Sequence, residues 1–148
     1  MNKPQLIAHL HALLAQKVSS IQADIASTLH ARNTDTKSSA GDKHEVGRAM
    51  IQQELDQQEA QLAKLQGLQH ELARVPLERV FDRVAFGSLV STDQGSYFIA
   101  IGLGQVEVSG ETCFAISLAS PIGQALKDKQ VGDMVSFNGR DIAVQAIQ

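Results

Sequence analysis

Two carboxylates at a three-residue spacing are the feature of this sequence that comes closest to chemistry. Asp42 and Glu45 lie in the segment Gly41-Asp42-Lys43-His44-Glu45, where a helix is predicted to begin. The spacing places both side chains on one side of the first helical turn. A structural interpretation is a capping box, which also suits the positive end of the helix dipole. A chemical interpretation is a pair of oxygen ligands for a hard cation such as Mg²⁺.

The charges around these carboxylates favour contact with phosphates. Residues 30–50 contain four basic and three acidic residues, whereas residues 51–75 contain two against four and residues 76–148 five against eight. We therefore count Lys37, Lys43 and Arg48 among the candidate partner-binding residues. The net charge of the whole chain, −3, argues against a protein that coats nucleic acid through bulk charge, so we expect no independent DNA binding.

The rest of the chain offers no enzyme site. Cys113 is the only cysteine, which excludes an internal disulfide and a multi-cysteine zinc site, and it lies in a β-rich run where we expect it to be buried. All five histidines precede residue 76, and neither a P-loop nor a dinucleotide fingerprint is present. Apolar runs are too short to span a bilayer and no signal peptide is recognisable, so we expect a cytoplasmic protein without a membrane partner.

Two long helices are predicted to carry the carboxylates. Apolar residues recur at alternating steps of four and three in two segments, which is the spacing of a coiled-coil seam. The first set is Ile7, His11, Leu14, Val18, Ile21, Ile25 and Thr28, and the second is Ile51, Leu55, Gln58, Leu62, Leu65, Gln69 and Leu72. Residues 33–41 between them are rich in turn formers, so the two helices should fold back as an antiparallel hairpin with arms of ~40 Å.

The composition changes near Pro76. The chain has 148 residues, of which only 4% are aromatic, and all six aromatics follow Pro76 together with eight of the eleven glycines. A thin helical seam of Leu, Ile and Val needs no aromatic side chain, which accounts for the low content. The predicted domains are therefore a hairpin over residues 1–75 and a second domain over residues 76–148.

The second domain should be a small antiparallel sheet with one short helix, which makes the chain α+β. Four β-rich runs are interrupted by turn residues. They are Ser88–Thr92, Ser96–Ile101, Gln105–Val108 and Thr112–Ser117. Asn138-Gly139 predicts a type I′ hairpin turn that sets Val135 opposite Ile142. Ser120-Pro121 predicts the start of a helix that ends near residue 127.

Two motifs in this order resemble the Gre transcript-cleavage factors of bacterial RNA polymerase. The segment from Gly41 to Glu45 matches the Gly-Asp-x-x-Glu that this family carries between two hairpin helices. The segment 116–122, Ile-Ser-Leu-Ala-Ser-Pro-Ile, resembles the C-terminal signature of the family, as do the residues that follow it. These are Leu126, Lys129 and Val131-Gly132-Asp133.

The resemblance implies a fold and a function. The second domain would have an FKBP-like fold and dock on the rim of the polymerase secondary channel, with Ser120 and Pro121 near the contact. The hairpin would enter the channel, where Asp42 and Glu45 would help to hold the second Mg²⁺ and its attacking water. The polymerase would then cleave the 3′ end of backtracked RNA. The protein would be a cofactor of the polymerase and not an enzyme, with no cofactor stably bound to itself.

Alternatives remain open. The family usually has Asn after the tip Glu and an aromatic soon after it, whereas this chain has Val46 and Ala49, and Ala119 replaces a polar residue before Ser120. A regulator or inhibitor of the polymerase without cleavage activity is therefore one alternative. A prolyl isomerase or chaperone is another, although we expect six aromatics to be too few to fill both a core and a pocket. A third is a coiled-coil scaffold, in which Gln58 and Gln69 would set the register.

Overall fold

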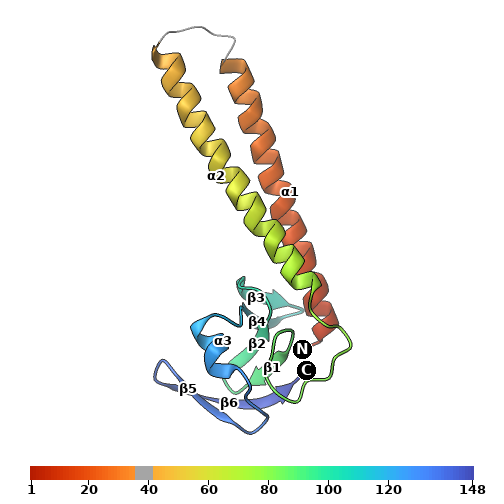
Figure 1. Cartoon of the computed structure of the whole chain (residues 1–148). Helices are drawn as coiled ribbons and strands as arrows, with labels where there is room; N and C mark the ends of the chain where they lie inside the picture. Colours follow the sequence, from red (N-terminus) through yellow and green to blue (C-terminus); the bar gives the residue numbers. More distant parts are fainter. Residues whose placement is uncertain (36–41) are drawn as a thin grey trace. The chain divides into compact units, whose positions relative to one another are not determined.

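The α+β class is confirmed by the order of the elements (Figure 1). The computed structural model describes residues 1–35 and 42–148, and the side chains of all of these except 35 and 42–44. Two long helices, α1 (Lys3–Asp35) and α2 (Asp42–Ala73), precede a six-stranded sheet. One short helix, α3 (Pro121–Leu126), lies between the fourth and fifth strands in the chain. The strands are β1 (Leu89–Thr92), β2 (Gly95–Ile99), β3 (Gly104–Val108), β4 (Glu111–Ile116), β5 (Met134–Phe137) and β6 (Arg140–Ile147).

The chain forms two compact units, and both long helices contribute to each of them. The sheet unit comprises Met1–Leu10 and His70–Gln148, and the helical unit comprises His11–Gln69. The boundary near Pro76 was inferred from composition, whereas these units are defined by contacts in space. The assignment of domains to residues 1–75 and 76–148 stays a prediction.

The helical unit is an antiparallel pair with an aliphatic seam. Residues 17–24 of α1 share a cavity with residues 61–65 of α2, and residues 30–34 share another with residues 47–54. Residues further along α1 therefore face residues earlier in α2, which means that the two helices run antiparallel. The predicted seam is confirmed over most of its length, because its members from Leu14 to Leu65 are buried or half-buried, whereas the predicted member His11 is exposed. Thr28, a polar member of the seam on α1, donates its hydroxyl to the main-chain oxygen of Asp24 at 2.9 Å.

Burial along this seam decreases toward the far end of the hairpin. Beyond Thr28 on α1 and Leu55 on α2, none of the described side chains of the two arms is fully buried. Ile51 is half-buried. One turn below Leu55, the Oε1 atom of Gln58 is buried without a hydrogen-bond partner among the described residues. The hairpin therefore has a well-packed lower part and a loosely packed end.

The sheet is mixed, which corrects the prediction of an antiparallel sheet. Its strand order is β3-β4-β2-β1-β6-β5, and β2 runs parallel to β4 with Tyr97 beside Phe114. The strands β3 and β4 form a hairpin through Ser109-Gly110, both of which have positive φ. Turn residues predict such a hairpin but not which of its strands pairs with β2. Because β4 carries the buried Cys113 and Ala115, it takes the inner position, and β3 becomes the edge.

The β5–β6 hairpin and α3 agree with the sequence. Asn138 and Gly139 have φ of 51° and 76°, as a type I′ turn requires, and Val135 lies opposite Ile142. The helix α3 lies against one face of the sheet (Figure 1), over a cluster of aliphatic side chains. The cluster consists of Val84, Val90, Ile99, Leu126, Val135, Ile142 and Val144. No aromatic side chain belongs to this buried cluster.

The first turn of α1 is bound into the sheet unit by polar contacts. Asn2 caps the helix by accepting a hydrogen bond from the main-chain nitrogen of Gln5 at 3.0 Å. The buried Lys3 donates from Nζ to the main-chain oxygen of Gln148 at 3.1 Å, and its ammonium lies 4.5 Å from the ring centre of Phe81. Burial lowers the pKa of Lys3. The start of α1 is thus a structural part of the sheet unit.

Replacing Gln58 with Leu is expected to stabilise the helical unit. The change removes a buried oxygen that has no hydrogen-bond partner and extends the aliphatic seam, so the free energy of unfolding should rise by about 1–2 kcal/mol. Urea unfolding followed by circular dichroism measures this quantity. Gln57→Leu, at an exposed neighbouring position, is the control. An equal effect of the two variants would contradict the role given to the buried oxygen.

Candidate functional site

The acidic motif lies where the sequence predicted, at the beginning of α2. This helix starts at Asp42, and Glu45 follows in its first turn with an exposed side chain. Lys37 and the side chains of Asp42 and Lys43 lie outside the described residues. The choice between a capping box and a pair of metal ligands therefore stays a prediction. Arg48, one turn after Glu45, is exposed.

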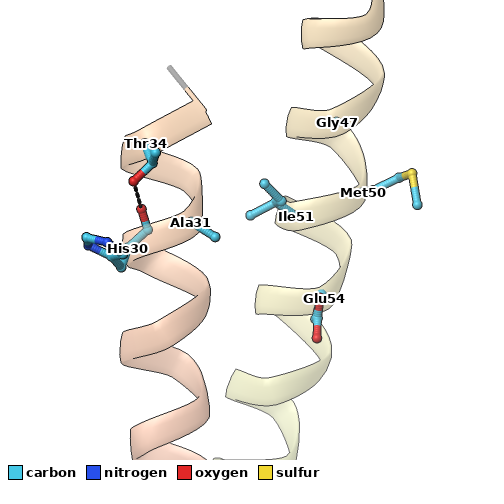
Figure 2. Close-up of a pocket in the computed structure, with 7 residues that line it drawn as sticks. All are labelled: His30, Ala31, Thr34, Gly47, Met50, Ile51 and Glu54. Carbon is cyan, nitrogen blue, oxygen red and sulfur yellow. Dashed lines mark hydrogen bonds between the residues drawn. The ribbon is translucent and has the colours of Figure 1, made fainter. Parts of the chain in front are cut away.

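The arms next to this motif enclose an open groove. It has a volume of about 720 Å³ and lies between residues 30–34 of α1 and residues 47–54 of α2. Figure 2 shows Ile51 pointing from α2 toward α1, whereas Met50 points away from it. Met50 and Val46 are 66% and 60% exposed, although both are large apolar side chains. The described residues at this end of the hairpin thus include two large apolar side chains that are mostly exposed.

Metal ligands are not assembled elsewhere in the part of the chain that the structure describes. Within residues 1–35 and 42–148, no three His, Cys, Asp or Glu side chains are grouped so that they could hold a metal ion. Cys113 is buried as expected, and burial raises the pKa of its thiol to about 11. Among the described helices, none is long and apolar enough to cross a membrane.

Ser120 and Pro121 open α3 as the sequence predicted, and they do so in different ways. The Ser120 hydroxyl accepts a hydrogen bond from the main-chain nitrogen of Gly123 at 3.1 Å and donates one to the oxygen of Ser117 at 2.7 Å. Its role in the structure is therefore that of an N-cap. Pro121 occupies the first helical turn with an exposed ring. Of the two predicted contact residues, Pro121 is exposed and Ser120 is half-buried.

The turn before α3 leaves no room for a side chain at Gly123. A β-carbon added there would lie 2.3 Å from the main-chain oxygen of Ser117 and 2.8 Å from that of Leu118. Both oxygens belong to the backbone, which cannot move aside as a flexible side chain would. The glycine therefore fixes where α3 lies relative to the end of β4, and with it the position of Pro121 and Ile122.

Next to α3, the same face of the sheet contains a pocket that we call the aromatic pocket. Its volume is about 430 Å³. Tyr97 of β2 and Phe114 of β4 stack with ring centres 5.5 Å apart. The remaining lining comes from β4, α3 and the β5–β6 hairpin, with polar groups from two turns. These residues are Gln94, Ile116, Ile122, Phe137, Asn138, Arg140 and Ile142.

The aromatic pocket corrects the expectation that six aromatics could not supply both a core and a pocket. Phe81 and Phe98 are buried elsewhere in the sheet unit and the cluster under α3 is aliphatic, whereas Tyr97, Phe114 and Phe137 are half-buried in the pocket walls. The helix α3 is only six residues long, so it covers only part of the sheet face. The alternation of side chains along β2, β4 and β5 indicated which residues share a face of each strand. It did not indicate which strands are neighbours, so the pocket could not be predicted from the sequence.

Comparisons with known proteins find similarity only among solved structures. No protein-family model matches the chain, and neither does any curated protein. The chain is similar to a structure of the transcription factor Gfh1, with 23% identity over 93% of this chain and 92% of that chain and a TM-score of 0.38. It is also similar to Gfh1 of Thermus aquaticus, with 20% identity over 92% of both chains and a TM-score of 0.36.

Replacing Ser120 with Ala is expected to destabilise the sheet unit by about 1 kcal/mol, because α3 loses its N-cap. Ser120→Thr retains both the capping oxygen and the hydroxyl that donates to the Ser117 oxygen, so it should remain close to the parent protein. Thermal unfolding of the full chain measures both, and Ser136→Ala at an exposed strand position is the control for loss of a hydroxyl. If alanine and threonine at position 120 gave the same stability, the cap would not be the role of this side chain.

Proposed function

We propose that this protein is a Gre-type factor that binds bacterial RNA polymerase in the cytoplasm and acts through the polymerase secondary channel. The observation that carries the proposal is the position of the Gly-Asp-x-x-Glu motif at the start of α2, at the end of an antiparallel helix pair. The 25 and 28 residues that α1 and α2 contribute to the helical unit correspond to a length of about 40 Å. Such an element can carry two carboxylates into a deep channel.

In this proposal the two carboxylates complete a metal site that the polymerase supplies. Asp42 and Glu45 have the oxygen donors that Mg²⁺ prefers, but two carboxylates alone make a poor site, so the other ligands come from the partner. Mg²⁺ supplies the acidity that makes a bound water a nucleophile toward the backtracked RNA. The part played by this chain is to hold two negative oxygens in place at the end of the hairpin, without catalysis of its own.

The sheet unit provides the contact that keeps the factor on the polymerase. Pro121 is exposed at the start of α3, and Ile122 next to it lines the aromatic pocket. Aromatic side chains in a concave surface are common anchors of protein interfaces. The exposed Val46 and Met50 give the hairpin end apolar surface to bury inside the channel.

Regulation without cleavage is the alternative within this proposal. The residue after Glu45 is Val46, which is 60% exposed and has no polar group to orient a water or the RNA end. A hairpin that enters the channel without completing the metal site would obstruct it. The cleavage assay below separates the two roles.

Asp42→Asn and Glu45→Gln are expected to reduce cleavage of backtracked RNA by at least about tenfold each, equivalent to about 1.4 kcal/mol of transition-state stabilisation. The amides keep the size of the side chains but remove the negative oxygens, and Asn caps a helix as well as Asp does. The measurement uses stalled, backtracked polymerase complexes with Mg²⁺ and follows the length of the RNA. Glu59→Gln, at an exposed position along α2, is the control.

Two results would overturn parts of this proposal. If the parent protein binds the polymerase but leaves RNA 3′ ends intact, the cleavage role is wrong and regulation replaces it. If it does not bind the polymerase at all, the Gre-type assignment is wrong. If both amide variants were fully active, the two carboxylates would have no role in cleavage and the motif would serve only as a helix cap.

Prolyl isomerisation is a second candidate, because the aromatic pocket offers the apolar walls that such a site needs. If this were the activity, the chain would accelerate cis–trans exchange of a proline-containing test peptide, and Phe114→Ala would abolish the acceleration. We expect no acceleration above the uncatalysed rate. A rate that depends on Phe114 would contradict this expectation.

A further inference from the structure

The aromatic pocket has one charged side chain in its lining, Arg140. The other lining residues are apolar or neutral. Arg140 is exposed at the start of β6, directly after the Asn138-Gly139 turn. Within the described part of the chain, its guanidinium takes part in no hydrogen bond, ion pair or ring stacking. The pocket therefore carries a positive charge that nothing described in the chain neutralises.

The strand geometry keeps the nearest carboxylates away from this charge. Arg140 and Ile142 are two residues apart on β6 and so share the face that lines the pocket, whereas Asp141 between them belongs to the opposite face. Asp93, in the turn beside Gln94, accepts a hydrogen bond from the main-chain nitrogen of Ala143 at 2.8 Å. Neither carboxylate forms an ion pair with Arg140, so among the described residues the guanidinium is free to pair with a carboxylate of a partner.

We propose that the aromatic pocket binds an apolar side chain of a partner protein that carries a carboxylate next to it, and that Arg140 selects this carboxylate. The stacked rings of Tyr97 and Phe114 and the wall formed by Ile122 provide an apolar seat. A guanidinium pairs with a carboxylate through two parallel hydrogen bonds, which adds direction as well as affinity. An acidic residue beside a leucine or phenylalanine satisfies both parts of the site.

The form of the pocket favours a protein segment over a small organic acid. Small ligands are usually enclosed on most of their surface. Here Tyr97, Phe114, Ile116, Ile122 and Phe137 are all half-exposed, so the pocket is a shallow depression. Pro121 extends the apolar surface beyond the pocket to the start of α3. Aromatic and arginine side chains at the centre of such a surface are the residues that most often dominate protein interfaces.

This inference rests on the proposed function only for the identity of the partner. A segment of RNA polymerase with an apolar and an acidic residue side by side would be the occupant if the Gre-type assignment holds. The chemistry of the pocket can be tested without the polymerase, so the two proposals can fail separately.

The full-length protein provides its own reporter for this test. Tyr97 is the only tyrosine and the chain has no tryptophan, so tyrosine fluorescence reports directly on the pocket. The probes are three capped eleven-residue peptides that share a central Leu and differ only in the next residue, which is Glu, Gln or Lys. We expect the parent protein to bind the Glu peptide about tenfold more tightly than the Gln peptide, as for a charge-assisted pair.

Variants at position 140 test whether Arg140 causes the preference for the Glu peptide. Arg140→Gln should remove the difference between the Glu and Gln peptides, and Arg140→Glu should reverse the preference in favour of the Lys peptide. Arg83→Gln, at an exposed arginine in another loop of the sheet unit, should keep the parent preference. Because Arg140 is exposed and unpaired within the described residues, thermal unfolding of all variants should match the parent within about 2 °C.

Three results would overturn the inference. Equal binding of the Glu and Gln peptides by the parent protein would show that Arg140 selects nothing. Absence of binding to any of the three peptides would show that the pocket takes no such segment. Binding of hexanoate more tightly than the Glu peptide would assign the pocket to small acids instead. Loss of polymerase binding by the parent protein would overturn the proposed function and leave this test unaffected.

Discussion

The aliphatic seam between α1 and α2 is the contact on which the rest of this protein depends. A single exposed helix of this composition gains little from its backbone alone, so each arm persists because its apolar stripe is buried against the other. Leu14, Ile21 and Leu65 provide this burial in the lower part of the pair, and Leu55 is its last fully buried member on α2. Asp42 and Glu45 belong to α2, so their position depends on the packing of this seam.

The seam weakens toward the end that carries the acidic motif. Gln58 contributes a buried oxygen without a partner, and beyond Leu55 the described side chains are at most half-buried. Regions with few buried apolar contacts open more easily than the core. The exposed Val46 and Met50 add apolar surface at the same end. Among the described residues, the apolar packing of the pair is therefore concentrated in the part that lies between Leu14 and Leu65.

In the sheet unit, the few aromatic side chains of the chain are divided between the interior and the surface. A short helix of six residues covers part of one sheet face, and aliphatic side chains fill the space below it. The uncovered part of the face retains Tyr97, Phe114 and Phe137, which form a surface with pronounced apolar character. Arg140 adds a single charge to this surface. The chain thus buries Phe81 and Phe98 and leaves three other rings half-exposed on the sheet unit.

The local elements were readable from the sequence alone: the two seams, the N-cap at Ser120 followed by Pro121 in the first helical turn, the Asn138-Gly139 turn and the place of Asp42 and Glu45 at the start of α2. These depend on spacing and on residues a few positions apart, which a sequence displays directly. The tertiary structure alone decided that β4 pairs parallel with β2, that Tyr97 meets Phe114, and that Arg140 shares their pocket. These contacts join residues from different strands. The order of the strands depends on which side chains of the whole chain are buried most favourably, and a local sequence pattern does not contain this information.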